Sequence, residues 1–230
     1  MTKVPQLRLT NICKKYGSNT VLDNINLIVQ PSEILFLVGK NGSGKSTLFN
    51  IILNVIFPDQ GSVEINSARQ NVGSCLTSLT LFPNKNAFEN LKYYAMQLGI
   101  KKFEISLNPL FPLFTDEYKK PVKGFSSGMK KILSLAIAFL PTNLQLLLLD
   151  EPMEFLDMHA KEIVKTALMN YNKNGVTLLI ASHNTEDISY FKGDCCFLVE
   201  GKIQQVISYL DIIETHETIL NAYQHFNSEQ

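Results

Sequence analysis

The sequence has no excess of either charge. Its 230 residues include 21 Lys and Arg and 21 Asp and Glu, so the formal net charge at pH 7 is zero. A chain without net charge has no overall field that draws it to nucleic acid or to an anionic membrane surface. The balance of charge therefore argues against nucleic acid as a partner.

The sequence also lacks a cysteine pattern of metal or disulfide type. The four cysteines are Cys13, Cys75, Cys195 and Cys196, and no two of them have the Cys-x-x-Cys spacing of a zinc site. They do not form the dense framework of a small secreted domain either. We therefore expect a chain that works in the reducing cytosol.

Long apolar runs are missing as well. A helix that crosses a bilayer needs about 20 mostly apolar residues, and no run in the sequence approaches that length. The opening stretch, MTKVPQLRLT, has no apolar core of a secretory signal. We expect a chain that is not itself embedded in a membrane.

What the sequence does contain is the material for a packed core, since 45% of its residues are hydrophobic and only 18% are charged. Alternation of apolar residues predicts antiparallel strands over 7–29, with turns near Gly17 and Asp23-Asn24. Continuous apolar runs predict buried strands at 34–38, 144–149, 176–181 and 195–199, and shorter strands are expected at 62–66 and 203–207.

Helices are expected between these strands. One follows the glycine loop after the strand at 34–38 and ends before Pro58, and a second is capped by Asn86, with Glu89 at its third position, and ends near Gly99. The proline-containing stretch 101–123 is expected to be irregular or briefly helical. Further helices are predicted to end at Leu140 and Gly175, and a last one covers about 208–230. Strands that alternate with helices predict an α/β fold with a mostly parallel sheet and a ligand site along one edge.

The clearest motif is GKNGSGKS, Gly39 to Ser46, which follows an apolar strand and opens a helix. It matches the G-x-x-x-x-G-K-[ST] phosphate-binding pattern in the context that the pattern requires. Its glycines let main-chain N–H groups converge on phosphate oxygens, Lys45 neutralises phosphate charge, and Ser46 can bind Mg²⁺.

Acidic and histidine side chains are predicted at the ends of two other strands. LLLLDEP, Leu146 to Pro152, delivers Asp150 and Glu151 to the sheet edge, where two carboxylates are costly to bury without a cation or ligand. We expect Asp150 to hold Mg²⁺ through its water shell and Glu151 to polarise the water that attacks a γ-phosphate. His183, after the third strand, can hydrogen-bond a phosphate oxygen.

A second glycine turn, FSSGMKK at Phe125 to Lys131, also opens an apolar helix. Ser126 and the N–H groups around Gly128 would lie at a helix N-terminus, which favours anions. A simple capped helix start would explain the same residues, so the turn by itself leaves both interpretations open.

In their order along the chain, these motifs resemble the ATP-binding subunit of an ABC transporter. That family has a phosphate loop, a signature turn of LSGGQ type, an acid strand ending in DEP, an aspartate loop and a switch histidine. GKNGSGKS, FSSGM, LLLLDEP, Asp157 and His183 follow one another in the same way, and the resemblance covers Leu7 to about Ile207.

The resemblance implies a P-loop NTPase core with a mostly parallel sheet, an antiparallel β subdomain and a small helical subdomain over about 88–140, all in one domain of residues 1–230. It implies an ATPase that dimerises around ATP and Mg²⁺, as a homodimer or with a similar subunit. The signature turn of each subunit would close over ATP held by the phosphate loop of the other.

Roles follow from the resemblance for individual residues. The catalytic group would be Glu151, His183 and Lys45, and the metal ligands Ser46 and Asp150. The residues that bind nucleotide would be Tyr16, which stacks on adenine, Gly39, Asn41, Gly42, Ser43, Gly44, Lys45, Ser46, Thr47, Ser126, Gly128 and Asp157. Tyr16 could also be a turn residue, and Asp157 could also be a helix cap.

The sequence departs from the family pattern at Thr77, which stands where the family has a glutamine that reaches Mg²⁺ and links hydrolysis to the membrane partner. FSSGM also has Ser127 and Met129 in place of the usual residues. A weakly hydrolytic ATP-dependent clamp is therefore one alternative. Another is an ABC-type ATPase that acts on ribosomes or DNA, and it would usually carry two ATPase copies or a long insertion.

The preferred interpretation is an ATPase that drives a separate membrane-spanning subunit, with the chain on the inner face of the cell membrane. Within the resemblance, FSSGMKK and the segment LFPNKNAFENL look more like those of exporters for drugs, peptides or polysaccharides than those of nutrient importers.

Overall fold

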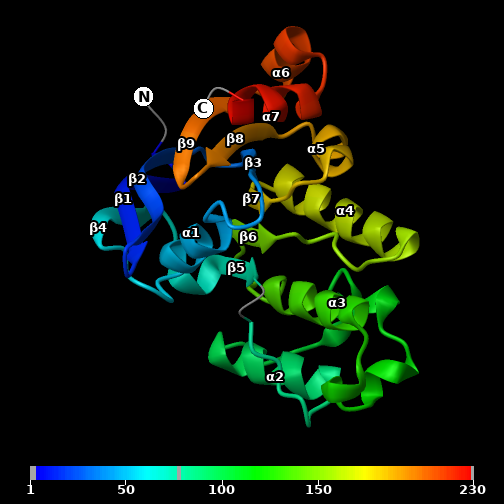
Figure 1. Cartoon of the computed structure of the whole chain (residues 1–230). Coiled ribbons are helices and arrows are strands. Elements are labelled where there is room, and N and C mark those ends of the chain that lie inside the picture. Colours follow the sequence, from blue (N-terminus) through cyan, green and yellow to red (C-terminus); the bar gives the residue numbers. More distant parts are fainter. Residues whose placement is uncertain (1–3, 77–78, 229–230) are drawn as a thin grey trace. The chain divides into compact units, whose positions relative to one another are not determined.

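The computed structural model describes residues 4–76 and 79–228, coloured along the sequence in Figure 1. The chain divides into two compact units, which are described separately. Unit 1 combines Met1–Asn66 with Thr177–Gln230, and unit 2 is Ser67–Val176. Thr77 lies outside the described residues. The single domain of residues 1–230 and the limits of the helical subdomain stay predictions.

One sheet of unit 1 is antiparallel, with strand order β2-β1-β4. Its strands are β1 (Leu7–Tyr16), β2 (Asn19–Val29) and β4 (Gln60–Ile65). The predicted turn at Gly17 is confirmed, since it joins β1 to β2. The predicted turn at Asp23-Asn24 is wrong: β2 runs through these residues, and the pairing with β1 shifts its register there instead. A bulge thus absorbs the turn-forming residues without ending the strand.

The other strands of unit 1 follow the order β7-β3-β8-β9. β3 (Ile34–Val38) pairs in parallel with β7 (Thr177–Ala181) and β8 (Asp194–Val199), and β9 (Lys202–Ile207) pairs antiparallel with β8. Because β3 is flanked on both sides, its residues from Leu35 onward are buried. These strands confirm the predicted parallel core, and their carboxyl ends carry the phosphate loop and His183.

Four helices belong to the described part of unit 1. They are α1 (Lys45–Ile52), α5 (Thr185–Phe191), α6 (Tyr209–His216) and α7 (Ile219–Ser228). The prediction of one C-terminal helix over about 208–230 is wrong, because the helical conformation is interrupted at Glu217, where φ is 62°. α7 packs on β8 through Phe226, whose ring centroid lies 4.8 Å from that of Phe197.

Unit 2 pairs the parallel strands β5 (Val72–Cys75) and β6 (Leu146–Asp150). Its helices are α2 (Ala87–Gln97), α3 (Ser127–Ala138) and α4 (Met158–Lys173). All five residues of β6 are buried, as the apolar run LLLL predicts. Gly73 of β5 lies so close to Ala138 that a Cβ atom would overlap the Ala138 main-chain oxygen, so α3 packs tightly on this strand.

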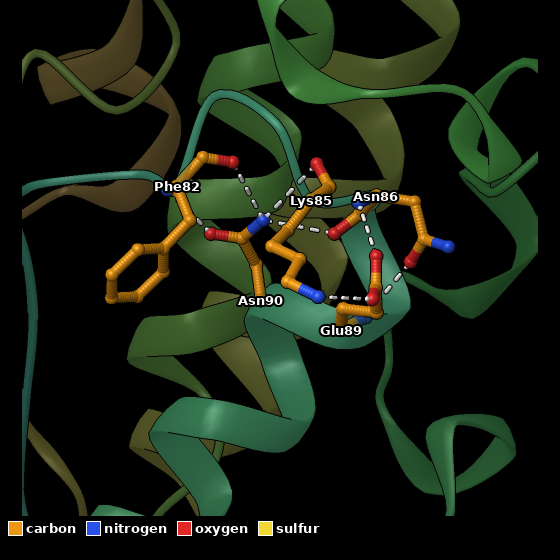
Figure 2. Close-up of polar contacts among 5 residues, drawn as sticks. All are labelled: Phe82, Lys85, Asn86, Glu89 and Asn90. Carbon is orange, nitrogen blue, oxygen red and sulfur yellow. Dashed lines mark hydrogen bonds and ion pairs between the residues drawn. The ribbon is translucent and has the colours of Figure 1, made fainter.

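The start of α2 is held by a capping box. The Asn86 side chain accepts a hydrogen bond from Glu89 N at 2.9 Å, and the Glu89 carboxylate accepts one from Asn86 N at 2.9 Å. Lys85 pairs with Glu89 at 2.9 Å. The buried Asn90 amide bonds the main chain at Phe82 and Asn86, as Figure 2 shows. The predicted cap is confirmed, and Asn90 fixes the segment that leads into it.

The stretch from 101 to 124 has no long helix, as expected from its prolines. It forms short 3₁₀ turns, at Ile105–Leu107, Phe111–Leu113, Asp116–Lys119 and Val122–Gly124. Another such turn, Arg69–Asn71, precedes β5. Nowhere in residues 4–76 and 79–228 is there a helix of the length and apolar character that a bilayer crossing needs.

Candidate functional site

The loop Gly39 to Ser46 joins β3 to α1 in unit 1, in the strand, loop and helix order that the motif predicts. Gly42 and Gly44 have φ values of 85° and 106°, in the left-handed region that glycine adopts without strain. Gly44 is the N-cap of α1, and a Cβ atom there would lie 2.7 Å from Leu22 Cδ2. Both the backbone conformation and the packing therefore require glycine at this end of the loop.

The Lys45 side chain folds back over the loop. Its Nζ donates to Gly39 O at 2.6 Å and to Lys40 O at 3.0 Å, and the side chain is buried. These two carbonyl oxygens hold the ammonium group in place over the loop. The role of Lys45 in neutralising phosphate charge stays a prediction.

The Ser43 hydroxyl indicates whether this loop can bind a phosphate group. Its Oγ is buried and has no hydrogen-bond partner in the described structure. A buried hydroxyl without a partner costs about 1–3 kcal/mol, so such groups call for an explanation. A phosphate oxygen would supply the missing acceptor, and the loop therefore fits the group that the motif predicts.

Gly39 closes the loop on its other side. A Cβ atom on Gly39 would overlap the main-chain oxygen of Leu198 in β8 and would lie 2.6 Å from Ser43 Oγ. Only glycine lets the loop approach the neighbouring strand so closely. The sequence motif shows the glycine, but it does not show the strand that makes it necessary.

Three further loop residues lie at or near the surface. Asn41 and Ser46 are exposed, and Thr47 is half-buried in the first turn of α1. This first turn contains no acidic side chain, so its N–H groups and dipole remain favourable to anions. The binding of a cation by Ser46 stays a prediction.

His183 lies beside the phosphate loop. Together with Gly39 and Asn41 it lines a cavity of about 310 Å³, whose other walls include residues of α5 and α7. The histidine ring is exposed and follows β7 by two residues. The structure thus brings the predicted switch histidine and the phosphate loop to one cavity. The sequence motifs do not indicate that α7 contributes to the wall of this cavity.

Tyr16 is the last residue of β1, and 52% of its surface is exposed. The Lys14 ammonium lies 5.6 Å from the centroid of its ring, and Lys14 also pairs with Asp59 at 2.9 Å. An exposed aromatic face of this kind can accept a nucleobase. The proposed stacking of Tyr16 on adenine remains a prediction.

In unit 2, Asp150 ends β6 and Glu151 follows it. Asp150 is 7% exposed, while Glu151 is half-buried with φ 47°. A left-handed conformation costs a non-glycine residue about 1–2 kcal/mol, and strained residues of this kind concentrate at functional sites. Lys131 of α3 donates to both main-chain oxygens, at 3.2 Å for Asp150 and 2.9 Å for Glu151. These bonds, which the motifs do not indicate, stabilise the strained turn.

The signature turn forms the N-terminus of α3. Ser126 is the N-cap, and its Oγ accepts a hydrogen bond from Met129 N at 3.2 Å. The capped helix start that the sequence left open is therefore present, and it does not compete with an anion site at the remaining N–H groups. A Cβ atom on Gly128 would lie 2.7 Å from Phe155 O, so the turn packs against the segment that follows the two acids.

Asp157 is the N-cap of α4, with its Oδ1 accepting from Ala160 N at 2.8 Å. Its carboxylate is also near Tyr118: burial, and next the negative charge of Asp157, raises the pKa of Tyr118 to about 12. The helix-cap role of Asp157 is confirmed, and the role in communication between two ATP sites stays a prediction.

The predicted residues fall into two groups. Unit 1 holds Tyr16, the phosphate loop and His183, and unit 2 holds the signature turn, the two acids and Asp157. In the described part of the chain, no three His, Cys, Asp or Glu side chains are grouped as a metal site. Mg²⁺ prefers few protein oxygens together with water and phosphate, so the Ser46 hydroxyl and the Asp150 carboxylate are suitable donors.

Comparison with known proteins decides the family. The family model described as ABC transporter matches residues 22–154, more than half of the chain. The chain belongs to the ABC transporter family. This confirms the resemblance that the motifs carry.

Two relatives cover most of this ABC transporter chain. A lantibiotic transport ATP-binding protein, SrtF of Streptococcus pyogenes, is 29% identical over 86% of the chain and 88% of its own length. A Nod factor export ATP-binding protein I of Sinorhizobium fredii is 31% identical over 85% of the chain and 61% of its own length. The prediction of an ATP-binding subunit is confirmed at the level of the family.

Solved structures confirm the fold. The structure of an ATP-binding subunit of an ABC transporter matches 97% of this chain and 100% of its own, with a TM-score of 0.87 and 22% identity. The dimeric structure of MJ0796, a bacterial ABC transporter cassette, matches 88% and 98%, with a TM-score of 0.79 and 22% identity. The α/β fold with parallel and antiparallel sheets is therefore that of ABC ATPase cassettes.

Proposed function

We propose that this chain is the ATP-hydrolysing subunit of an exporter: it dimerises around ATP and drives a separate membrane-spanning subunit. The observation that carries the proposal is the phosphate loop, in which the Ser43 hydroxyl is buried without a partner and Lys45 is folded over the loop carbonyls. The cavity shared by that loop and His183 adds support. The direction of transport rests on the relatives, which include a Nod factor export protein and a teichoic acids export protein.

In this proposal, each residue has one task. The phosphate loop binds the triphosphate, Lys45 balances its charge and Tyr16 stacks on adenine. Ser46 and Asp150 would hold Mg²⁺, which neutralises charge on the phosphates when it is bound. Glu151 polarises the attacking water and His183 contacts the γ-phosphate.

The second subunit supplies the remaining contacts. The ATP bound by one chain is contacted by Ser126, Gly128 and Asp157 of the other chain. A helix N-terminus can bind an anion that is held by a different chain. Closure of the dimer sequesters ATP, and release of the products opens it again. The membrane partner places the chain on the inner face of the cell membrane.

The proposal is tested by phosphate release from Mg-ATP by the full chain and by Glu151→Gln. Removing the group that activates water should lower the rate by about 10²-fold or more, while ATP still binds. Glu154→Gln is the matched control, since Glu154 is an exposed carboxylate three residues further on, and its rate should equal that of the wild type. Equal background rates for wild type and Glu151→Gln would reject hydrolysis and leave a nucleotide-binding clamp.

A further inference from the structure

Lys131 belongs to the FSSGMKK turn, but its side chain does not point to the helix N-terminus. It reaches the end of β6, where Nζ donates to Asp150 O at 3.2 Å and to Glu151 O at 2.9 Å. The side chain is half-buried. A positive group therefore joins the signature helix to the main chain that carries the two functional acids, all within unit 2.

The Glu151 carbonyl is held from two sides. Besides the Lys131 ammonium, the Glu154 main-chain N–H donates to it at 3.1 Å. Glu151 itself has φ 47°, a conformation that a glutamate keeps only when its surroundings impose it. The Asp150 and Glu151 carbonyls flank the Glu151 Cα atom, so the two Lys131 bonds together restrain φ and ψ of Glu151. They thereby restrain the direction in which the Glu151 side chain leaves the backbone.

The same helix touches the acid segment at a second point. Gly128 packs against Phe155 O, where a Cβ atom would lie only 2.7 Å from that oxygen. Gly128 and Lys131 are three residues apart on one helix, so they move together. A displacement of the signature turn is thus transmitted to residues 150–155 through two contacts.

Electrostatics support this placement. The buried Cys75 thiol, at the end of β5, has its pKa raised to about 11, chiefly by burial. The positive charge of Lys131 opposes this shift and the negative charge of Asp150 adds to it. The charges of Lys131 and Asp150 therefore both act on a thiol at the end of β5. Lys131 also borders a cavity of about 420 Å³ together with Lys130, Glu154 and Phe155.

We propose that Lys131 is a positioning residue for ATP hydrolysis, holding the main chain of Asp150 and Glu151 so that Glu151 is directed correctly. Through α3, Lys131 makes this position depend on the signature turn. Occupation of that turn by the facing subunit's nucleotide therefore stabilises the active position of Glu151 in the same chain. The proposal rests on the proposed function, and it assigns no contact between Lys131 and ATP.

The first test measures ATP hydrolysis by Lys131→Met, which keeps an unbranched apolar side chain and removes the donor. A misplaced carboxylate should lower kcat by about 10- to 100-fold and leave KM for ATP within about twofold, because the phosphate loop is untouched. Lys131→Arg can donate to both carbonyls and should restore most of kcat. Lys130→Met, on the exposed neighbour, is the matched control and should behave as the wild type.

A loss of kcat in Lys131→Met with rescue in Lys131→Arg supports the proposal. Wild-type kcat in Lys131→Met, or a Lys131→Arg as slow as Lys131→Met, overturns it. A rise in KM alone also overturns it, since that result would give Lys131 a role in binding ATP. All of these outcomes require a wild type that hydrolyses ATP. If the proposed function is wrong, the wild type itself does not hydrolyse ATP, so the two kinds of failure can be distinguished.

The second test needs no turnover. Hydrogen exchange of the Glu154 amide reports the bond to Glu151 O, and Lys131→Met should increase its exchange rate by about tenfold or more while α4 amides exchange as in the wild type. Lys130→Met should leave the Glu154 amide unchanged. Unchanged exchange at Glu154 in Lys131→Met would show that Lys131 does not hold this segment, and would overturn the proposal.

Discussion

Gly39 of the phosphate loop lies against Leu198 of β8, so closely that a Cβ atom on Gly39 would overlap the Leu198 main-chain oxygen. Glycine is therefore required at position 39 by the packing on β8 as well as by phosphate binding. Two independent requirements meet at this residue: close approach of the backbone to a ligand and close packing of the loop on the sheet.

Gly39→Ala should therefore impair folding as well as binding. Because the loop has to move away from β8, the free energy of unfolding should fall by about 1–3 kcal/mol, and ATP affinity should fall with it. Gly124→Ala is the control, since nothing lies within 4 Å of a Cβ atom there. Urea unfolding without nucleotide checks both variants, and a Gly39→Ala as stable as Gly124→Ala would contradict the packing argument.

Ser43→Ala should separate binding from stability. Its Oγ has no partner in the described structure, so removing it without nucleotide should leave the free energy of unfolding unchanged or slightly raise it. ATP affinity should fall about fivefold, the equivalent of one neutral hydrogen bond of about 1 kcal/mol. Calorimetric titration with ATP measures this. If affinity stayed the same while stability dropped, the hydroxyl would have a structural role instead.

Asn90→Ala should destabilise unit 2 strongly. The Asn90 amide is fully buried and bonds Phe82 N at 2.8 Å and Asn86 O at 2.8 Å (Figure 2). Truncation leaves the part-buried Phe82 N–H without its acceptor, while Asn86 O keeps its bond from the Asn90 main-chain N–H at 3.1 Å. The expected cost is about 1–3 kcal/mol. Lys92→Ala, on the exposed side of α2, should change stability by less than about 0.5 kcal/mol. Equal unfolding midpoints for the two variants would contradict the assignment.

Acid should weaken the start of α2 through Glu89. The hydrogen bond from Asn86 N, and next the bond from Lys85, hold the pKa of Glu89 below its ordinary value of 4.5. A lowered folded-state pKa contributes stability that is fully present above 4.5 and is lost as the pH falls through the folded-state value. Glu89→Gln lacks this term. The difference in unfolding free energy between wild type and Glu89→Gln should therefore shrink in acid, and a difference independent of pH would contradict the assignment.

Motif and periodicity predict most of the elements that carry the site, because each has a local cause. Asn86 and Glu89 form their box within one turn, and GKNGSGKS needs only the strand before it and the helix after it. Two of the predictions were wrong for reasons that the structure shows. Turn-forming residues at Asp23-Asn24 became a bulge because β1 continues to pair with β2. The left-handed Glu217 splits a helical stretch that no glycine or proline interrupts.

Other features could not be predicted because they depend on contacts between distant residues. The bonds of Lys131 to Asp150 and Glu151 span about 20 positions, and the approach of Gly39 to Leu198 spans many more. The α7 wall of the cavity beside His183 arises in the same way. Spacing within a motif carries no information on such contacts, although the contacts decide how rigidly the motif is held.

The central claim is that two copies of the chain share each ATP, with the phosphate loop of one and the signature turn of the other. Sedimentation of Glu151→Gln with saturating Mg-ATP tests it most directly, since this variant should bind ATP without consuming it. We predict a species of twice the mass of the chain, and the chain mass alone when Lys45→Ala is added to abolish ATP binding. If Glu151→Gln bound ATP and still sedimented with the mass of one chain, the shared site would be contradicted.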